Sequence, residues 1–324
     1  MLLVAYLLIA AAFGFAISIG AHYTGACMGM PYAAGAIRLV PALLLMAPLA
    51  LVGAVFASGA VESTVGHGIL GSAPVALALA LAIVLAAVIL TSAYNFLTLP
   101  TSTIQILVFS AVGAGLGAGV AIQWATIESL LVLWAIAPFV AFGLGFLLTR
   151  AVDRLRPPVA TSARPKLLPQ YAVLGLVGVG SAASFAMGAN DVSNASGAFI
   201  MTGLFGLMVA GLVGGVGLAL GVLTWGRPLL RTVAFDIVAL DARTATISQL
   251  SQSAVILVSV GFGFFTSMNQ ALVGAMIGTG VARRQTTKLR RSVRNILVGW
   301  ALGPVSGAAV GFLFAVSFHA AGWL

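Results

Sequence analysis

The residues with the greatest chemical capacity stand together in one short segment between two apolar stretches. Gly188-Ala189-Asn190-Asp191-Val192-Ser193-Asn194-Ala195 places a carboxylate, two carboxamides and a hydroxyl within five residues. An ionisable group inside a membrane costs about 2.5–3.5 kcal/mol on insertion scales, so it is usually paired and functional. The flanking glycines predict a break in a helix, where free backbone N–H and C=O groups can bind ions. The structural alternative is that Asp191 caps a helix at the membrane interface.

Two hydroxyl-rich elements recur about 165 residues apart. Thr101-Ser102-Thr103-Ile104-Gln105 in the first half corresponds to Thr266-Ser267-Met268-Asn269-Gln270 in the second. A helix that begins at such residues presents free N–H groups and a favourable dipole to an anion. A single Ser or Thr in a membrane helix more often packs or bonds to its own helix. Because these hydroxyls occupy equivalent places in both halves, we interpret them as substrate-binding.

A diverged copy of the first segment lies near the N-terminus. Gly20-Ala21 matches Gly188-Ala189, so His22 and Tyr23 hold the positions of Asn190 and Asp191. His22 is equally consistent with a proton carrier, with a hydrogen-bond donor to an anion and with a structural histidine.

The elements that must position these residues belong to a duplicated unit of about 160 residues. Trp134-Ala135-Ile136-Ala137-Pro138 returns as Trp300-Ala301-Leu302-Gly303-Pro304, and all the repeated blocks keep their order. Duplication in so apolar a chain is typical of transporters. We therefore predict a first transmembrane repeat at 1–149, a linker at 150–170 and a second transmembrane repeat at 171–324.

Composition makes the chain an integral membrane protein. It is 61% hydrophobic and only 6% charged, with a mean hydropathy of +1.16, whereas a soluble domain carries about 25% charged residues. The long apolar runs lack the alternation of barrel strands and predict an all-α fold. Cys27 is the single cysteine, so no intrachain disulfide can form and a cysteine-based metal site is not expected.

Ten apolar segments predict about ten transmembrane helices, five in each half, together with broken or re-entrant segments such as the one that begins near Thr266. Two copies of a unit with an odd number of spans must lie in the membrane upside down relative to each other, which predicts inverted-topology repeats. The segments lie near 2–19, 39–58, 75–92, 105–121, 127–149, 171–187, 203–224, 247–264, 271–282 and 295–318.

The distribution of basic residues sets the predicted orientation. With the N-terminus outside, all fifteen Lys and Arg fall in inside loops and none in outside loops, which hold only Glu62 and Glu128. This is the positive-inside pattern, and it explains the net charge of +9 without nucleic acid. We predict a multi-pass protein of the cell membrane with a cytoplasmic linker and both termini outside.

At these motifs the sequence resembles the inorganic phosphate transporter (PiT) family, and the resemblance spans most of the chain. Gly188 to Ala195 is similar to the family's Gly-Ala-Asn-Asp-Val-x-Asn-Ala signature, and Pro100 to Gln105 partly reproduces its Pro-Val-Ser-Thr-Thr-His element. The resemblance implies an inverted-repeat fold that moves phosphate with sodium or protons. The first repeat lacks the signature Asn and Asp. Its stretch from Gly20 to Ile37, with Met28-Gly29 and Tyr32-Ala33-Ala34-Gly35-Ala36-Ile37, looks more like the sulfate-permease branch of the family.

The resemblance and the residues together predict one site between the repeats. Asp191 and Asn190 are the predicted coupling-ion ligands, and the predicted substrate ligands are Asn190, Ser193, Asn194, His22, Thr24, Ser102, Thr103, Thr266 and Ser267. No Lys or Arg lies in these motifs, so hydroxyls and backbone N–H groups would hold the anion.

The predicted function is import of inorganic phosphate by a secondary active transporter coupled to Na⁺ or H⁺, with sulfate permease as the alternative. A passive anion channel is the rival of another class. An enzyme is not predicted, because an intramembrane aspartyl protease needs two carboxylates and no zinc or nucleotide motif is present. No cofactor is expected. The predicted partners are phosphate or sulfate, the coupling cation and the lipid bilayer, with a homodimer as an option and no nucleic acid.

Overall fold

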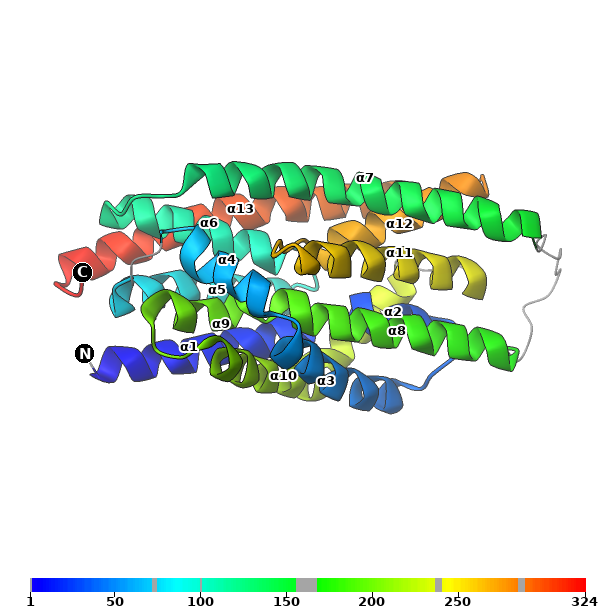
Figure 1. Cartoon of the computed structure of the whole chain (residues 1–324), viewed down its shortest axis with the longest axis horizontal. Coiled ribbons are helices and arrows are strands. Elements are labelled where there is room, and N and C mark those ends of the chain that lie inside the picture. The colour runs from blue at the N-terminus through cyan, green and yellow to red at the C-terminus, as the bar shows by residue number, and fades with distance from the viewer. Residues whose placement is uncertain (1, 72–74, 100, 156–167, 237–240, 285–288) are drawn as a thin grey trace.

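The computed structural model describes residues 2–324 apart from 72–74, 100, 156–167, 237–240 and 285–288. Long helices lie side by side along one axis, and no strand occurs within these ranges (Figure 1). The predicted all-α class is confirmed. The first half contains α1 (Leu2–His22), α2 (Thr24–Ala33), α3 (Leu39–Phe56), α4 (Gly59–Gly68), α5 (Leu77–Phe96), α6 (Thr103–Ala118) and α7 (Trp124–Leu155). The second half contains α8 (Gln170–Asp191), α9 (Ser193–Thr202), α10 (Leu207–Asp236), α11 (Ala242–Gly261), α12 (Met268–Ala282) and α13 (Leu289–Ala320).

Each of the ten predicted apolar segments lies largely within a helix, but fewer of the helices can span a membrane by length and composition. Seven spans in the described residues meet both criteria, and α1–α2 and α8–α9 each count as one. Helices α6 and α12 have only 16 and 15 residues, and α11 is rich in Ser and Gln. Most residues of these three helices are buried against other helices, so they do not need a lipid-facing apolar length.

The predicted helix break is present in both halves. Val192, directly after Asp191, separates α8 from α9. Tyr23, directly after His22, separates α1 from α2. Each break is a single residue, so the two helices on either side of it continue in nearly the same direction. The polar segment thus lies inside the helical bundle rather than at a capped end near solvent.

The helices pair reciprocally between the two halves. Helix α1 packs on α10 as α8 packs on α3, α6 packs on α13 as α12 packs on α7, and α4 packs on α9 as α10 packs on α2. The two chain termini lie at one end of the molecule, and α7 and α8 meet the segment between the repeats at the other (Figure 1). Helices α1 and α8 therefore run in opposite directions, as inverted-topology repeats require.

Two matched glycines allow two of these helices to cross their partners closely. A Cβ atom on Gly188 would lie 1.9 Å from the carbonyl oxygen of Ala50, and one on Gly20 would lie 2.1 Å from that of Leu218. No side chain fits at either point. These are the small-residue contacts by which membrane helices associate in van der Waals contact, and they hold each broken segment against a helix of the other repeat.

The linker between the repeats is partly helical. Helix α7 continues to Leu155, beyond the predicted end of the first repeat at 149, and α8 begins at Gln170. Residues 156–167, which include most of the predicted linker, lie outside the described residues. The division into 1–149, 150–170 and 171–324 stays a prediction.

At the same end of the molecule, Arg283 joins three helices. Its guanidinium donates to Asp153 of α7 at 2.7 and 2.8 Å and to Asp241, the N-cap of α11, at 2.5 Å. The same two carboxylates hold the pKa of Arg283 above its ordinary value. This ion-pair cluster fixes the end of α12 against α7 and α11.

Candidate functional site

The two breaks meet two non-helical segments, 101–102 and 264–267, which lead into α6 and α12. The Asn190 side chain binds the second of these segments at both ends of its amide. Its Nδ2 donates to the carbonyl oxygen of Thr266 at 2.8 Å, and its Oδ1 accepts the N–H of Thr266 at 3.0 Å. Asn190 is fully buried, so this two-point contact fixes the Thr266 backbone relative to the α8–α9 break.

Asp191 lies beside Asn190 with half of its hydrogen-bonding capacity unused. Its Oδ2 accepts from Asn190 Nδ2 at 3.1 Å, whereas its Oδ1 has no partner among the described residues. Asn194 Nδ2 donates to Thr103 Oγ1 at 3.1 Å, and the Tyr23 hydroxyl lies 3.0 Å from the same oxygen. Residues of both breaks therefore converge on the first residue of α6.

His22 has partners suited to two protonation states. Asn95 Nδ2 donates to the Ser18 carbonyl, which leaves Asn95 Oδ1 to accept from His22 Nδ1 at 2.5 Å. The other ring nitrogen, Nε2, lies 3.1 Å from the Thr101 carbonyl and 3.4 Å from Asn269 Nδ2. A neutral ring accepts from Asn269 at Nε2, and a protonated ring donates from Nε2 to Thr101. The geometry thus accommodates a proton on His22 without moving its neighbours.

The starts of α6 and α12 are capped in the same way. Ser102 Oγ accepts the N–H of Gln105, and Ser267 Oγ accepts the N–H of Gln270, each at 3.4 Å. Because each serine oxygen acts here as an acceptor, its own proton remains available to an anion. The two capped helix starts are the positions that the sequence predicts for substrate contact.

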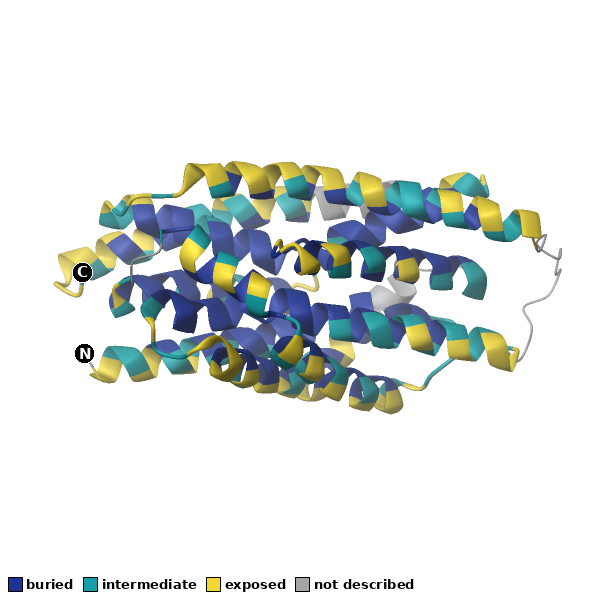
Figure 2. Ribbon diagram, viewed as in Figure 1, coloured by how far each residue is buried: buried dark blue, intermediate teal, exposed yellow. Residues whose placement is uncertain are grey.

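The site is closed to both sides of the protein. Asn190, Asp191, Asn194, Thr103 and Thr266 are completely buried. Figure 2 shows the buried residues, in dark blue, gathered along the helices in the middle of the bundle. No Lys or Arg is among the buried side chains of the described residues. Several buried acceptor atoms there have no partner, namely Asp191 Oδ1, Asn194 Oδ1, Thr101 Oγ1, Thr266 Oγ1 and Gln270 Oε1. Buried polar atoms are normally paired, so this group suits a bound cation.

Two predicted ligands have their hydroxyls engaged elsewhere. Thr24 Oγ1 donates to backbone carbonyls, those of Ala21 at 2.9 Å and Gly226 at 3.0 Å, and so faces α10. Ser193 Oγ donates to the Asn190 carbonyl at 2.9 Å. Both hydroxyls satisfy helix backbone near the breaks, which favours a packing role in this conformation. Their assignment as substrate ligands stays a prediction.

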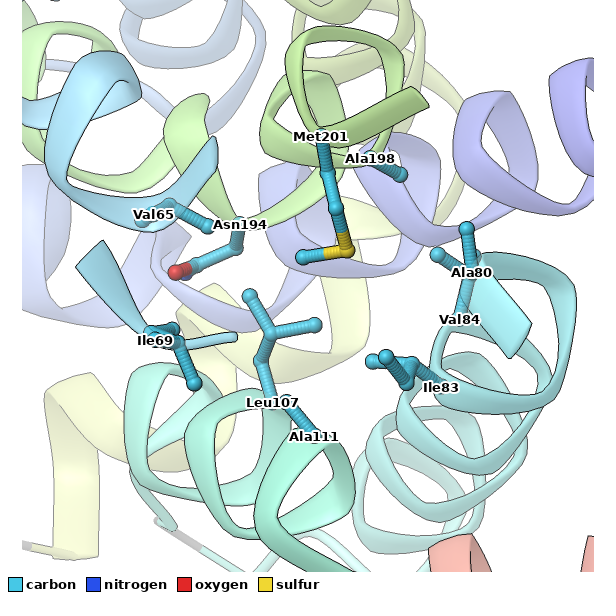
Figure 3. A pocket seen from close by; sticks show the side chains of 10 residues that line it. All are labelled: Val65, Ile69, Ala80, Ile83, Val84, Leu107, Ala111, Asn194, Ala198 and Met201. Atoms are coloured by element: carbon cyan, nitrogen blue, oxygen red, sulfur yellow. The ribbon is translucent and has the colours of Figure 1, made fainter. Parts of the chain in front are cut away.

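Beside Asn194 lies a small, mostly apolar cavity of about 10 Å³, about the space that one water molecule needs. Figure 3 shows Asn194 among aliphatic side chains of α4, α5, α6 and α9 that line it, including Val65, Leu107 and Met201. This cavity is too small for a tetrahedral oxyanion. Binding of such an ion therefore requires the helices to separate from the closed arrangement.

The fold brings several further residues to the site that are not among the predicted ligands. Tyr23 and Asn95 contact predicted ligands, Asn269 contacts His22, and Gln270 Nε2 donates to Gln105 Oε1 at 3.3 Å. The sequence could have predicted the two glutamines as site residues, because they end the two matching hydroxyl elements. Asn95 carried no such signal, since no repeated motif includes it.

Comparison with known proteins gives a consistent result. The model of a family described as the phosphate transporter family matches residues 19–311. The sulfate permease CysP of Bacillus subtilis is 28% identical over 94% of this chain and 85% of its own length. A probable low-affinity inorganic phosphate transporter of Mycobacterium bovis is 26% identical over 98% of this chain and 78% of its own.

The fold itself also has a solved counterpart. A structure described as the sodium-dependent phosphate transporter superimposes with a TM-score of 0.87 at 21% identity, and the match covers 98% of this chain and 99% of that one. At this identity the likeness concerns the fold. With seven apolar spans in the described residues, the chain is a multi-pass membrane protein.

Proposed function

Because the chain belongs to the phosphate transporter family, we propose that it carries inorganic phosphate across the cell membrane as a secondary active transporter. The observations that support this most directly are the unpaired carboxylate oxygen of Asp191 and the two capped helix starts. The carboxylate oxygen suits a cation, and the helix starts suit an anion. A site that takes both ions together is what a symporter requires.

The anion binds between the starts of α6 and α12. Ser102 and Ser267 donate their free hydroxyl protons, and the first N–H groups of the two helices add partial positive charge. Thr103 and Asn194 lie beside the α6 start and complete the contact. With no buried Lys or Arg among the described residues, a bound cation has to balance part of the anion's charge.

Asp191 holds the coupling ion. Its Oδ1 is a buried carboxylate oxygen with no partner among the described residues, so it is available to Na⁺ or a proton. Asn190 positions it, since this side chain is bound both to Asp191 Oδ2 and to the Thr266 backbone. His22 offers a second place for a proton, which allows proton coupling where the first half lacks an aspartate.

Sulfate is the alternative substrate. Its support is the similarity to the Bacillus subtilis sulfate permease and the His22-Tyr23 pair in the first break. Phosphate remains the first choice because the matching family is named for it and further relatives are named as phosphate permeases or phosphate transporters.

The orientation follows from charge. We assign the end of the molecule where α7 ends and α8 begins to the inside face, together with the ion-pair cluster around Arg283, and the end that holds the two termini to the outside face. Alternating access then moves the broken helices relative to their packed partners and opens the closed site to one face at a time.

The test is uptake of radiolabelled phosphate and of radiolabelled sulfate into proteoliposomes, each under a sodium gradient and under a proton gradient. We expect phosphate to accumulate above its external concentration under one of the gradients. Asp191→Asn should abolish gradient-driven uptake. The control Glu128→Gln, which makes the equivalent acid-to-amide change at an exposed position, should leave uptake intact. Equilibration without accumulation would indicate a channel. Accumulation of sulfate alone would show that the substrate is sulfate and not phosphate. Near-normal coupled uptake by the Asp191 variant would reject its role.

A further inference from the structure

Glu62 is the second buried acid of the bundle, and neither the proposed phosphate site nor the ion-pair cluster uses it. It lies on α4, which is not one of the spanning helices, and its exposed fraction is 1%. The sequence predicts an outside loop here, but the structure buries the side chain against α9. An isolated buried carboxylate is costly, so its surroundings should show which protonation state they accommodate.

The surroundings accommodate both states. Ser196 Oγ of α9 lies within hydrogen-bonding distance of Glu62 Oε1 and also 3.0 Å from the Val192 carbonyl oxygen. A hydroxyl has one proton, so it can donate to only one of these two acceptors. When Glu62 is ionised, Ser196 donates to the carboxylate. When Glu62 is protonated, its own O–H donates to Ser196, whose proton then turns to Val192.

This exchange acts on the α8–α9 break. Val192 is the residue that separates the two helices, and Asp191 directly precedes it. The proton on Glu62 therefore decides whether the first turn of α9 is tied to its own backbone by Ser196 or to α4. Ser58 Oγ, which donates to the Ala54 carbonyl at 2.5 Å, is the other hydroxyl that bonds to Glu62.

The fold itself does not require this polar contact. Gly20 matches Gly188, a shift of 168 residues, and the same shift takes Glu62 to Leu230 and Ser196 back to Met28. Leu230 and Met28 are completely buried apolar side chains on α10 and α2, the pair of helices that corresponds to α4 and α9. At these matched positions one repeat has two apolar residues, while the other has an acid and a serine.

An open depression of about 460 Å³ is lined by Ser63, Thr64 and His67 of α4, by residues at the start of α7 and by Phe264. Phe264 begins the non-helical segment that leads to Thr266 and the proposed site. Helix α4 therefore borders both this depression, whose lining is mostly apolar, and the Glu62–Ser196 contact.

No charged group holds Glu62 in one state. Helices α9, α10 and α11 pack on α4. Helix α9 has no titratable side chain, Arg227 and Arg231 of α10 are exposed, and Arg243 begins α11; none of them contributes to the pKa of Glu62, nor does His67 on α4 itself. Burial raises this pKa to about 7, while the two serine hydroxyls lower it.

We propose that Glu62 is a proton-binding site of the transporter, which changes the hydrogen bonding of the α8–α9 break through Ser196. The proposal rests on the proposed function only for its role in transport. Protonation of Glu62 is itself measurable in the absence of any substrate, so the two ideas can fail separately.

The first test is the infrared absorption of protonated carboxyl groups in the purified full-length protein, followed as a function of pH. We expect a band that disappears as the pH rises through about 7. Glu62→Gln should abolish this component, and Glu128→Gln, an exposed acid, should leave it unchanged. Ser196→Ala removes the donor to the carboxylate, so it should shift the midpoint upward; this variant also decides the question if Glu62→Gln does not fold.

The second test is the ratio of phosphate uptake by Glu62→Gln to uptake by the wild type at each pH, which cancels the titration of phosphate itself. A ratio that changes several-fold across neutral pH supports a role in transport, and a constant ratio excludes it. A band that is unaffected by Glu62→Gln overturns the proposal. If the wild type accumulates no anion, the proposed function fails, and the infrared titration still decides whether Glu62 binds a proton.

Discussion

Gln105 and Gln270 hold the same position in the two repeats and contact each other, with Gln270 Nε2 donating to Gln105 Oε1 at 3.3 Å. Equivalent residues touch only where the symmetry axis that relates two copies passes between them. The inverted repeats therefore meet at this pair, one turn into α6 and α12. Gln270 Oε1 has no hydrogen-bond partner among the described residues, so it can accept a further hydrogen bond at the centre of the proposed site.

We expect Gln270→Leu to impair uptake at least 10-fold, because it removes a buried donor and acceptor and leaves Gln105 Oε1 unpaired, a loss of about 1–3 kcal/mol. Uptake kinetics in proteoliposomes measure the effect. Gln123→Leu, at an exposed position on the loop before α7, is the matched control and should behave as the wild type. Normal kinetics in both variants would remove the glutamine pair from the site.

Asn190→Ala should reduce both stability and transport. It leaves the N–H and C=O of Thr266 without their side-chain partners, and each unpaired buried group costs about 1–3 kcal/mol. Ser193→Ala should have little effect, since that hydroxyl bonds only to the Asn190 carbonyl three residues earlier in the chain. Thermal unfolding in detergent and uptake assays measure the two quantities. A strong loss of uptake in the serine variant would restore Ser193 as a substrate ligand.

Gly188→Ala should prevent normal packing of α8 on α3. The added Cβ would lie 1.9 Å from the Ala50 carbonyl oxygen, and backbone atoms cannot yield as a flexible side chain can. Gly178→Ala, earlier in α8, meets nothing within 4 Å and serves as the control. The yield and monodispersity of the purified proteins measure the outcome. Equal behaviour of the two variants would contradict the close crossing.

The stability of the wild type should fall relative to Glu62→Gln as the pH rises. Burial raises the pKa of Glu62 from an ordinary 4.5 to about 7, so the folded protein favours the protonated form. This contribution is fully present below pH 4.5 and is lost as the pH passes through about 7. Melting temperatures of both proteins between acidic and alkaline pH measure it. A difference that stays constant with pH would mean that Glu62 does not titrate in this range.

Arg283→Gln should weaken the end of α12 by about 1 kcal/mol, as expected for a partly exposed ion-pair network, and the loss should shrink at high salt. A double-mutant cycle with Asp153→Asn isolates the pair, because these two side chains share two hydrogen bonds. Arg284→Gln, at the neighbouring exposed position, is the control. Additive effects of Arg283→Gln and Asp153→Asn on the melting temperature would show that the pair is not coupled.

The sequence by itself determined the membrane class, the helical fold, the repeats and the break beside Asp191. These features depend on local composition and on matches along the chain: apolar length sets a helix, and a glycine-flanked polar run interrupts it. The repeated Thr-Ser elements also predicted the two capped helix starts, because a cap depends only on residues within one turn.

Only the tertiary structure decided which side chains meet. Thr24 was a predicted ligand, but its hydroxyl bonds to Gly226, and Asn95 reaches His22 from a helix that no motif marked. Glu62 was expected in an outside loop and lies buried against Ser196, 134 residues away in the chain. Such contacts depend on how inverted helices cross, and the crossing is set by packing between residues far apart in sequence, which no local pattern records.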